Sequence, residues 1–140
     1  MRRAALLLCL VGCKGAEPPP PGAAGPVEAV QAFVAALQRG DAAAAYALLS
    51  SRTQREADRI AAQTRAAAGI DAGVPESGRQ MLFASALPQG KIDAREVARQ
   101  GEVAQVEVID QARRARTFRV VREGEVWKLD LDLPGADGGR

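Results

Sequence analysis

The spacing of apolar residues changes near Lys91 in this chain of 140 residues, and that change limits the folds open to it. Before Lys91 the apolar residues recur every three or four positions, which is typical of amphipathic helices. After Lys91 they alternate with polar residues, as in strands with one covered and one exposed face. Four runs are predicted to be strands: residues 92–99, 103–110, 115–122 and 125–131. Helices followed by consecutive strands predict a two-layer α+β domain, with N-terminal helices packed on an antiparallel meander.

Three helices are expected before the strands, and a glycine follows the first and the third. In the first helix, Phe33 and Leu37 lie on the apolar face. Asp41 suits the N-cap of the second helix, and Ser51 or Thr53 suits that of the third because each begins a capping-box pattern. The third helix has only a thin apolar stripe and is expected on the surface. The predicted ranges are 27–39, 42–49, and Ser51 or Thr53 to about Ala68.

The stretch between the third helix and the strands has a weaker pattern. Residues 70–78 are predicted to be a loop, and the short apolar cluster within residues 79–86 indicates a helical turn or a short strand that packs on the core. Residues 88–90, with one proline and one glycine, are predicted to be a turn before the first strand.

The first thirteen residues predict export and lipid attachment. Met1–Arg3 is basic, residues 4–11 are apolar, and the chain turns polar after Cys13. This order is typical of a secretory signal, and so short an apolar run cannot span a bilayer as a helix, which needs about 20 residues. The run LVGC at residues 10–13 looks like a bacterial lipobox. The resemblance implies cleavage after Gly12 and diacylation of Cys13, whose acyl chains would hold the mature protein on a membrane.

Other interpretations of Cys9 and Cys13 remain open. The segment also fits an ordinary secretory signal, and the two cysteines fit a disulfide or a metal pair. A metal pair is disfavoured because the chain has no histidine and no third cysteine to complete a zinc site. A disulfide would lie in the segment that the predicted cleavage removes. No cofactor is expected for this chain.

Four parts are predicted along the chain. Residues 1–12 form the signal peptide, and residues 13–26 form a tether that four consecutive prolines make semi-rigid. Residues 27–132 form one domain with a single core, and residues 133–140 form a flexible tail. Lys14 stands where the inner-membrane retention signal of some bacteria has an aspartate. The predicted location is therefore the bacterial cell envelope, and the outer membrane if the source has one.

Charge and aromatic content argue against nucleic acid as a partner. The chain has 19 basic and 17 acidic residues, and the predicted cleavage removes two of the arginines. Nucleic-acid binding needs a basic face with stacking aromatics, and only 4% of the residues are aromatic. The local excess of positive charge lies near one predicted hairpin: Arg113, Arg114, Arg116, Arg119 and Arg122. It is predicted to be a solvated sheet face, or an edge that repels other strands.

Two stretches resemble a known family. PVEAVQAFVAALQRGDAAAAYALLS, residues 26–50, resembles the opening of nuclear transport factor 2-like domains, particularly in small exported lipoproteins of unknown function. FRVVREGEVWKLDL, residues 118–131, is similar to their last hairpin. The resemblance implies a cone in which a curved sheet wraps around helices, often with a cavity at the open end. In relatives that cavity hosts catalysis, binds ligands or is filled by side chains, so the fold alone does not give the function.

The function expected first is non-catalytic binding of a small apolar ligand or of another envelope protein. Candidate pocket residues are Phe33, Leu37, Tyr46, Phe118 and Trp127. Each of them also fits plain core packing, because aromatics at helical or strand spacing are usually buried. Tyr46 and Trp127 are the better pocket candidates, since each has a polar end that must find a partner when buried.

The second function is an enzyme of the ketosteroid isomerase, dehydratase or cyclase type, as the resemblance implies for some relatives. Those enzymes use general acid–base catalysis, usually with His or Asp as the base. Without histidine, a pair would combine Tyr46 with Asp130, Asp93 or Glu96. Asp130 is expected on the exposed sheet face, opposite Trp127, which argues against it. No nucleophile, phosphate-binding or metal-ligand motif is present, so no catalytic residue is assigned and the chain is predicted not to be an enzyme.

The third function is assembly through the open face of the sheet, by which relatives in the resembling family often dimerise. That face is expected to carry Glu107, Arg119 and Lys128, which makes it rather charged for an obligate interface. A weak homodimer, or association with a different envelope protein, is the form of assembly that this pattern favours.

Overall fold

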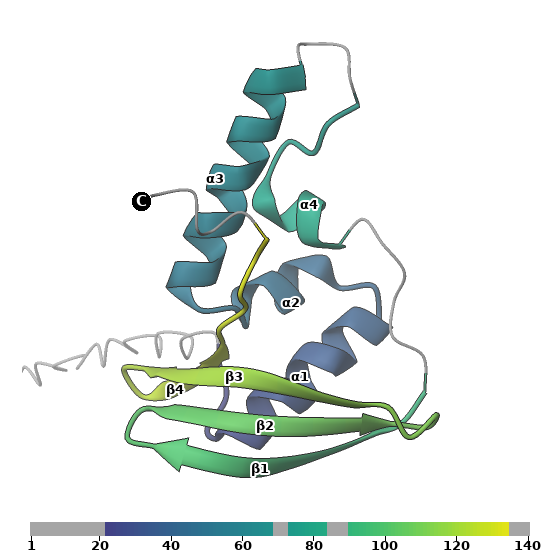
Figure 1. Ribbon diagram of the computed structural model, residues 1–140, viewed down its shortest axis with the longest axis vertical. Coiled ribbons are helices and arrows are strands. Elements are labelled where there is room, and N and C mark those ends of the chain that lie inside the picture. Colours follow the sequence, from purple (N-terminus) through teal and green to yellow (C-terminus); the bar gives the residue numbers. More distant parts are fainter. Residues whose placement is uncertain (1–21, 69–72, 84–89, 135–140) are drawn as a thin grey trace, which may run out of the picture.

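The computed structural model describes residues 22–68, 73–83 and 90–134 of the chain. Within these ranges helices come first and strands follow, which confirms the predicted α+β class (Figure 1). The elements are α1 (Pro26–Gln38), α2 (Ala42–Ala47), α3 (Ser51–Ala68), α4 (Gly78–Phe83), β1 (Ile92–Gln100), β2 (Val103–Asp110), β3 (Ala115–Glu123) and β4 (Val126–Leu129). The predicted signal peptide, lipid-attachment residue Cys13, most of the tether and most of the tail lie outside the described residues.

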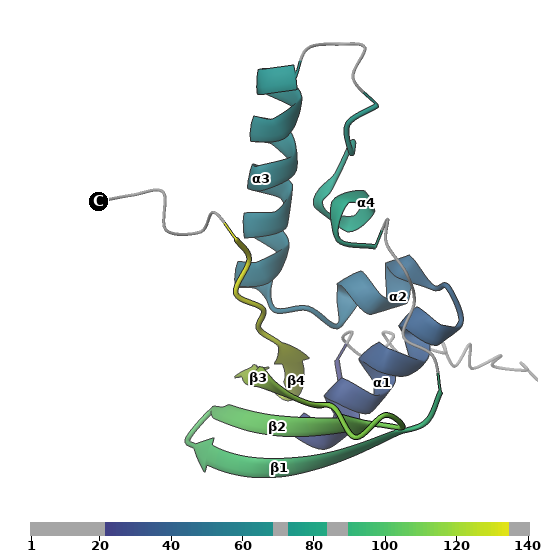
Figure 2. The ribbon, with the colours of Figure 1, turned by 45° about the vertical axis from the view of Figure 1, so that its right-hand side comes forward.

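The sheet is a meander in which each strand pairs antiparallel with the next, in the order β1-β2-β3-β4. The strands form because alternate residues are apolar, and their register places Val106 opposite Phe118 and Val120 opposite Leu129 on one face. The β1–β2 and β3–β4 turns each contain a glycine with positive φ, Gly101 and Gly124. Figure 2 shows that the sheet is curved, as predicted.

The edge strand β1 carries a bulge that bends it. Its register with β2 shifts between Glu96 and Ala98, which leaves Val97 as the extra residue. Val97 is 47% exposed, and charged residues flank it along a strand that is exposed over most of its length. Bulges and charges on an edge strand both hinder pairing with another chain. The opposite edge, β4, makes isolated bridges to Ala23 and Leu49.

Helix α1 covers one face of the sheet and packs against all four strands. It starts at Pro26, whose fixed φ suits the first helical position, and its apolar stripe faces the sheet. Val30 is fully buried in this layer, and Phe33 is almost so. Full burial of a side chain such as Val30 stabilises the fold by roughly 1.5–3 kcal/mol relative to leaving it exposed.

The core is one cluster formed by α1, by α2 with the residues that follow it, and by the sheet. Its buried residues are Ala29, Val30, Phe33, Val34, Ala36, Ala45, Leu48, Leu49, Ala104, Val106, Val108, Val120, Trp127 and Leu129. Because residues from both halves of the chain contribute, neither the helices nor the strands bury their apolar faces alone.

Helix α2 is shorter than predicted. Asp41 caps it as expected, by accepting a hydrogen bond from the backbone N–H of Ala44 at 3.0 Å. The helix ends at Ala47 and not at Leu49, because the chain straightens there to pair with β4. The backbone N–H of Leu129 donates to the carbonyl of Leu48, and that of Ser50 donates to the carbonyl of Leu129.

Helix α3 stands away from the sheet, with α4 beside it (Figures 1 and 2). Its only buried residues are Thr53, Ala57 and Ala61, which agrees with the predicted thin apolar stripe. Residues 79–83 lie in α4, so this part of the uncertain stretch is helical and not a strand. The two helices approach closely at Gly78, where an added Cβ would lie 2.6 Å from backbone atoms of α3. We call α3 and α4 together the arm.

None of the helices within the described ranges is both long enough and apolar enough to cross a membrane.

Candidate functional site

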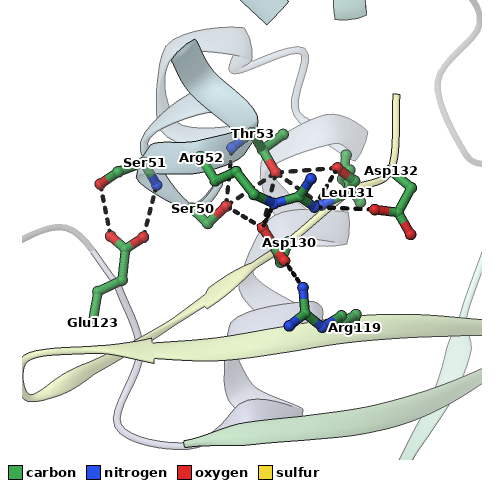
Figure 3. Close-up of polar contacts among 9 residues, drawn as sticks. All are labelled: Ser50, Ser51, Arg52, Thr53, Arg119, Glu123, Asp130, Leu131 and Asp132. Atoms are coloured by element: carbon green, nitrogen blue, oxygen red, sulfur yellow. Dashed lines mark hydrogen bonds and ion pairs between the residues drawn. The ribbon is translucent and has the colours of Figure 1, made fainter. Parts of the chain in front are cut away.

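The densest polar cluster among the described residues lies where the arm meets the sheet. It joins the first residues of α3 to the ends of β3 and β4 (Figure 3). We call it the α3 base network, and its members are Ser50, Ser51, Arg52, Thr53, Arg119, Glu123, Asp130, Leu131 and Asp132. The pairing of residues 48–50 with β4 brings these two parts of the chain together, although about 80 positions separate Ser50 from Asp130.

Ser50 is the N-cap of α3 and directly precedes its first residue, Ser51. The Ser50 hydroxyl accepts a hydrogen bond from the backbone N–H of Thr53 at 3.1 Å, as an N-cap does. The prediction that Ser51 or Thr53 caps the helix is therefore wrong by one or three positions. The error arises because the capping-box pattern needs Glu or Gln three residues after the cap, and Thr53 stands there after Ser50. The backbone N–H of Ser50, which a capping box would bind, donates instead to the carbonyl of Leu129.

Glu123 binds the first residue of α3 directly. One of its carboxylate oxygens accepts from the backbone N–H of Ser51 at 2.8 Å, and the other accepts from the Ser51 hydroxyl at 2.9 Å. A carboxylate at a helix N-terminus satisfies an otherwise unpaired N–H and interacts favourably with the helix dipole. Lys128 lies 3.9 Å from the second oxygen.

Asp130 is at the centre of the network and is only 4% exposed. Its Oδ1 accepts from the Ser50 hydroxyl at 2.6 Å and from Arg52 Nε at 2.9 Å. Its Oδ2 accepts from Arg119 Nη1. The Thr53 hydroxyl lies 3.4 Å from Oδ1 and also accepts from the backbone N–H of Leu131 at 2.9 Å. One buried carboxylate thus joins α3, β3 and the chain after β4.

Burial alone would raise the pKa of the Asp130 carboxyl. The hydrogen bonds from Arg52 and Ser50 and the positive charges of Arg52 and Arg119 outweigh that effect, so its pKa lies below the ordinary value. Asp130 is therefore ionised at neutral pH. It has no proton to donate, and its oxygens are already occupied by donors, so the arrangement suits a structural clamp better than acid–base chemistry.

The expected exposure of Asp130 is wrong, although its carboxylate contacts Arg119 on the side of the sheet opposite the core. β4 ends at Leu129, so the alternation of exposed and covered positions stops before Asp130. Beyond that point the chain rises along α3, and the base of that helix covers the carboxylate (Figure 3). No sequence signal predicts this cover, because the residues that provide it lie in a distant helix.

The five predicted pocket residues lie together in or against the core cluster. Phe33 and Trp127 are buried members, whereas Leu37, Tyr46 and Phe118 are partly buried and pack on it. The Phe33 ring lies 6.1 Å from the ring of Phe83 on α4, at 55°. Their shared position agrees with the core-packing interpretation of each residue.

Tyr46 finds a hydrogen-bond partner for its hydroxyl, whereas the contact of Trp127 with a charged residue is made by the face of its ring. The Tyr46 hydroxyl donates to the carbonyl of Gln54 at 3.0 Å. Burial, together with the nearby carboxylate of Asp58, raises the pKa of Tyr46 to about 12. Arg99 lies over the Trp127 ring, 5.0 Å from its centroid, in a cation–π contact.

The acids considered as partners of Tyr46 lie elsewhere. Asp130 is bound by Arg52 and Arg119, Glu96 is bound by Arg99, and Asp93 is exposed on β1. The carboxylate that interacts with Tyr46 is Asp58 of α3, which the sequence analysis did not consider. Asp58 Oδ1 also accepts from the backbone N–H of Gly78 at 2.8 Å, so this contact joins the three helices α2, α3 and α4.

A recess of about 360 Å³ lies on the β1–β2 hairpin, and none of the predicted pocket residues lines it. Its lining residues are Ala98, Arg99, Gln100, Val103 and Gln105. It follows the bulge of β1, and its open, mostly exposed walls differ from the enclosed apolar pockets that hold small ligands. Residue spacing gave no sign of it.

The charged residues predicted for the open sheet face already have partners within the chain. Glu107 binds Arg95 at 2.6 Å, Arg119 binds Asp130, and Lys128 lies 3.9 Å from Glu123. Among residues 22–68, 73–83 and 90–134, no group of three or more His, Cys, Asp or Glu residues is placed to hold a metal ion.

Comparisons with protein-family models, with curated proteins and with solved structures found no match to this chain. The resemblance to nuclear transport factor 2-like domains therefore stays a prediction from the sequence.

Proposed function

We propose that this chain is a lipid-anchored protein of the bacterial envelope whose domain binds a partner protein and has no catalytic role. The lipobox-like run at residues 10–13 supports the anchor, with Cys13 as the attachment residue. The domain supports binding because it presents an arm that its own core leaves largely uncovered.

The observation that carries this proposal is the exposure of α3. The helix has 18 residues, so it is about 27 Å long at 1.5 Å per residue. Every residue of its last two turns, Ala62 to Ala68, is exposed. A helix gains most of its stability by packing one face, and no residue of these turns is buried in the described part of the chain, where Arg65 donates a hydrogen bond to the carbonyl of Glu76 at 2.9 Å. A partner protein that covers them would supply the missing contacts.

A protein partner is favoured over a small apolar ligand. The residues predicted to line an apolar pocket, such as Phe33 and Trp127, lie in one cluster of buried apolar residues, which supports a packed core. The recess on the β1–β2 hairpin is open and is lined by Arg99, Gln100 and Gln105 as well as by small apolar residues. The recess is therefore more open than the enclosed apolar pockets that hold small molecules.

The anchor is tested first by the mass of the mature protein extracted gently in detergent. We expect a chain that begins at Cys13 and carries the mass of acyl groups. We expect the Cys13→Ala variant to lose both the processing and the fractionation with membranes. A Cys13→Ala protein that is still processed and still sediments with membranes would contradict the lipobox interpretation.

Partner binding is tested by photo-crosslinking in cells. A photoreactive amino acid replaces Ala66 on the exposed face of α3, and the matched control replaces Thr117, an exposed residue of β3. We expect one defined adduct from position 66 and none of that size from position 117. We also expect the adduct to weaken in the Cys13→Ala background, because the domain is then no longer held at the membrane. Identical adducts from both positions, or none from the arm, would contradict the proposal.

A further inference from the structure

The β2–β3 turn carries a concentration of exposed positive charge. Arg113 and Arg114 lie in the turn, Arg116 lies on the first part of β3, and Lys91 precedes β1 at the same end of the sheet. All four residues are exposed. We call these four residues the basic tip. In Figure 1 this turn lies at the right-hand end of the sheet, opposite the β1–β2 and β3–β4 turns.

The turn is built around Asp110 and not around a glycine. Asp110 Oδ1 accepts from the backbone N–H groups of Ala112 and Arg114, both at 2.9 Å, and Oδ2 accepts from Arg114 Nε at 2.7 Å. The hydrogen bond from the backbone of Arg114 is the main reason that the pKa of Asp110 lies below its ordinary value. Asp110 therefore stays ionised and holds the turn closed.

Arg113 adopts a left-handed backbone conformation, with φ of 61°. A residue with a Cβ rarely adopts this conformation, and the other two turns of the sheet place a glycine there. An arginine at such a position is locally unfavourable, and the bonds of Asp110 offset that cost. The arrangement holds a long cationic side chain at the outermost part of the turn, where a glycine would fold more easily.

Most of this positive charge is not neutralised within the chain. Arg114 shares the carboxylate of Asp110, whereas Arg113, Arg116 and Lys91 have no ion-pair partner in the part of the chain that the structure describes. The other acid at this end is Asp93, which is exposed opposite Ile109. The tip thus keeps a net positive charge toward solvent.

The composition of the tip favours an anionic surface over a shaped protein groove. The residues between its arginines are Ala112 and Ala115, so it lacks the aromatic or long aliphatic anchors on which protein interfaces depend. A layer of lipid phosphates needs only cations that can reach it. We propose that the basic tip binds the anionic headgroup layer of the membrane that carries the lipid anchor. This inference rests on the proposed function, because the anchor keeps that membrane within reach.

The dimensions of the chain permit this contact. Nine positions separate Cys13 from Gly22, and a polyproline II segment of that length spans about 28 Å. β2 has 8 residues and is about 26 Å long at 3.3 Å per residue. The described chain begins beside Trp127, near the opposite end of the sheet from the tip. A domain that lies with its strands along the membrane therefore reaches the headgroups with both ends.

The test measures vesicle binding of the full chain with Cys13→Ala, so that acylation does not mask the tip. Its affinity is compared for vesicles of phosphatidylcholine alone and vesicles that also contain phosphatidylglycerol. The tip variant is Arg113→Gln with Arg116→Gln. The matched control is Arg55→Gln with Arg79→Gln, which removes the same charge from two exposed residues of the arm, away from the sheet and its tip. Any binding by the apolar leader is common to all of these proteins and cancels in the comparison.

We expect the tip variant to lose roughly 25-fold in affinity for phosphatidylglycerol vesicles at low salt, about fivefold for each arginine near an anionic surface. The control variant is expected to change by less than about threefold, because the field of a charge far from the surface is screened within a Debye length. In 1 M salt, where that length is about 3 Å, the difference between the variants should disappear.

Equal losses in the tip variant and the control would show a general charge effect and would overturn the inference. A second pair of results would also overturn the inference: the tip variant binds phosphatidylglycerol vesicles as well as the unchanged tip does, and it loses the α3 crosslink. These results together would assign the tip to a protein partner. An unmodified Cys13 in the native mature chain would overturn the anchor alone. The vesicle comparison still decides the role of the tip in that case, because it does not use acylation.

Discussion

Asp130 lies one residue beyond the end of β4, and this position places its carboxylate inside the protein and not in solvent. Alternation along the strand predicted the side of the sheet correctly, since Arg119 contacts Asp130 from the face opposite the core. It did not predict that the base of α3 covers this side. Arg52 and Ser50, which provide the cover and two of the hydrogen bonds, come from a segment about 80 positions earlier.

Replacing Asp130 by Asn should destabilise the fold by about 2 kcal/mol. The amide removes the charge that Arg52 and Arg119 face, and hydrogen bonds to charged groups contribute about 1.5–3 kcal/mol each. The expected loss of stability lies near the lower end of that range, because both arginines are nearly half exposed and solvent screens their charges. Urea unfolding measures the change. The control is Asp93→Asn on exposed β1, for which we expect a change within about 0.5 kcal/mol.

The same residue predicts a pH dependence. The pKa of Asp130 is lower in the folded chain than its ordinary value of 3.8, so the unfolded chain binds a proton first as pH falls. The stabilisation that ionised Asp130 gives to the fold is present above pH 4. It is lost as pH falls below that value toward the pKa of Asp130 in the folded chain. Unfolding free energies measured between pH 7 and pH 2 should therefore converge for the wild type and Asp130→Asn. A constant difference across this range would contradict the assignment.

At the scale of elements, α3 shows how far local patterns reach. Its existence, its thin apolar stripe and its surface position were predicted from spacing and are confirmed. Its N-cap was not, because Ser50 caps the helix without a capping-box pattern: the third residue after it is Thr53, and the N–H of Ser50 donates to Leu129 of β4. β4 was predicted to reach residue 131 but ends at Leu129, where the chain leaves the sheet to follow the helix.

The packing of the arm depends on Gly78. An added Cβ would lie 2.6 Å from the backbone carbon of Ala57 and the backbone nitrogen of Asp58, neither of which can move without the helix. We expect Gly78→Ala to destabilise the protein by about 1–3 kcal/mol and to increase hydrogen exchange in α3 and α4. Gly25→Ala is the control, because its nearest neighbour is the flexible end of Glu28. Equal hydrogen exchange of α3 in the Gly78→Ala and Gly25→Ala variants would show that packing against α4 does not stabilise α3.

At the scale of the whole molecule, the question is whether the space between helices and sheet is a pocket or a packed core. Phe33, Trp127 and the half-buried Phe118 belong to one cluster with aliphatic residues from α1 and the strands. Residue spacing could not separate these two interpretations, because a residue that lines a cavity and a residue that fills it occupy the same face of a helix or strand.

Phe33→Ala separates the two interpretations. In a packed core the substitution removes the ring contacts with Phe83 and leaves a cavity, so we expect a loss of about 3–4 kcal/mol in unfolding free energy. A residue that lined an open pocket would lose much less. Urea unfolding measures the difference, and the conservative variant Phe33→Leu should recover most of the lost stability. A change below about 1 kcal/mol would favour a pocket.

The sequence by itself determined the order of the elements, the antiparallel meander and the faces that α1 and the strands bury. These depend on residue spacing within one segment, and hydrophobic burial fixes the face that each segment turns inward. Only the tertiary structure decided the base of α3, the surroundings of Asp130 and the partner of Tyr46. Each of these joins residues from distant segments through hydrogen bonds and ion pairs, which depend on position to within a few tenths of an ångström. A local pattern does not carry that information.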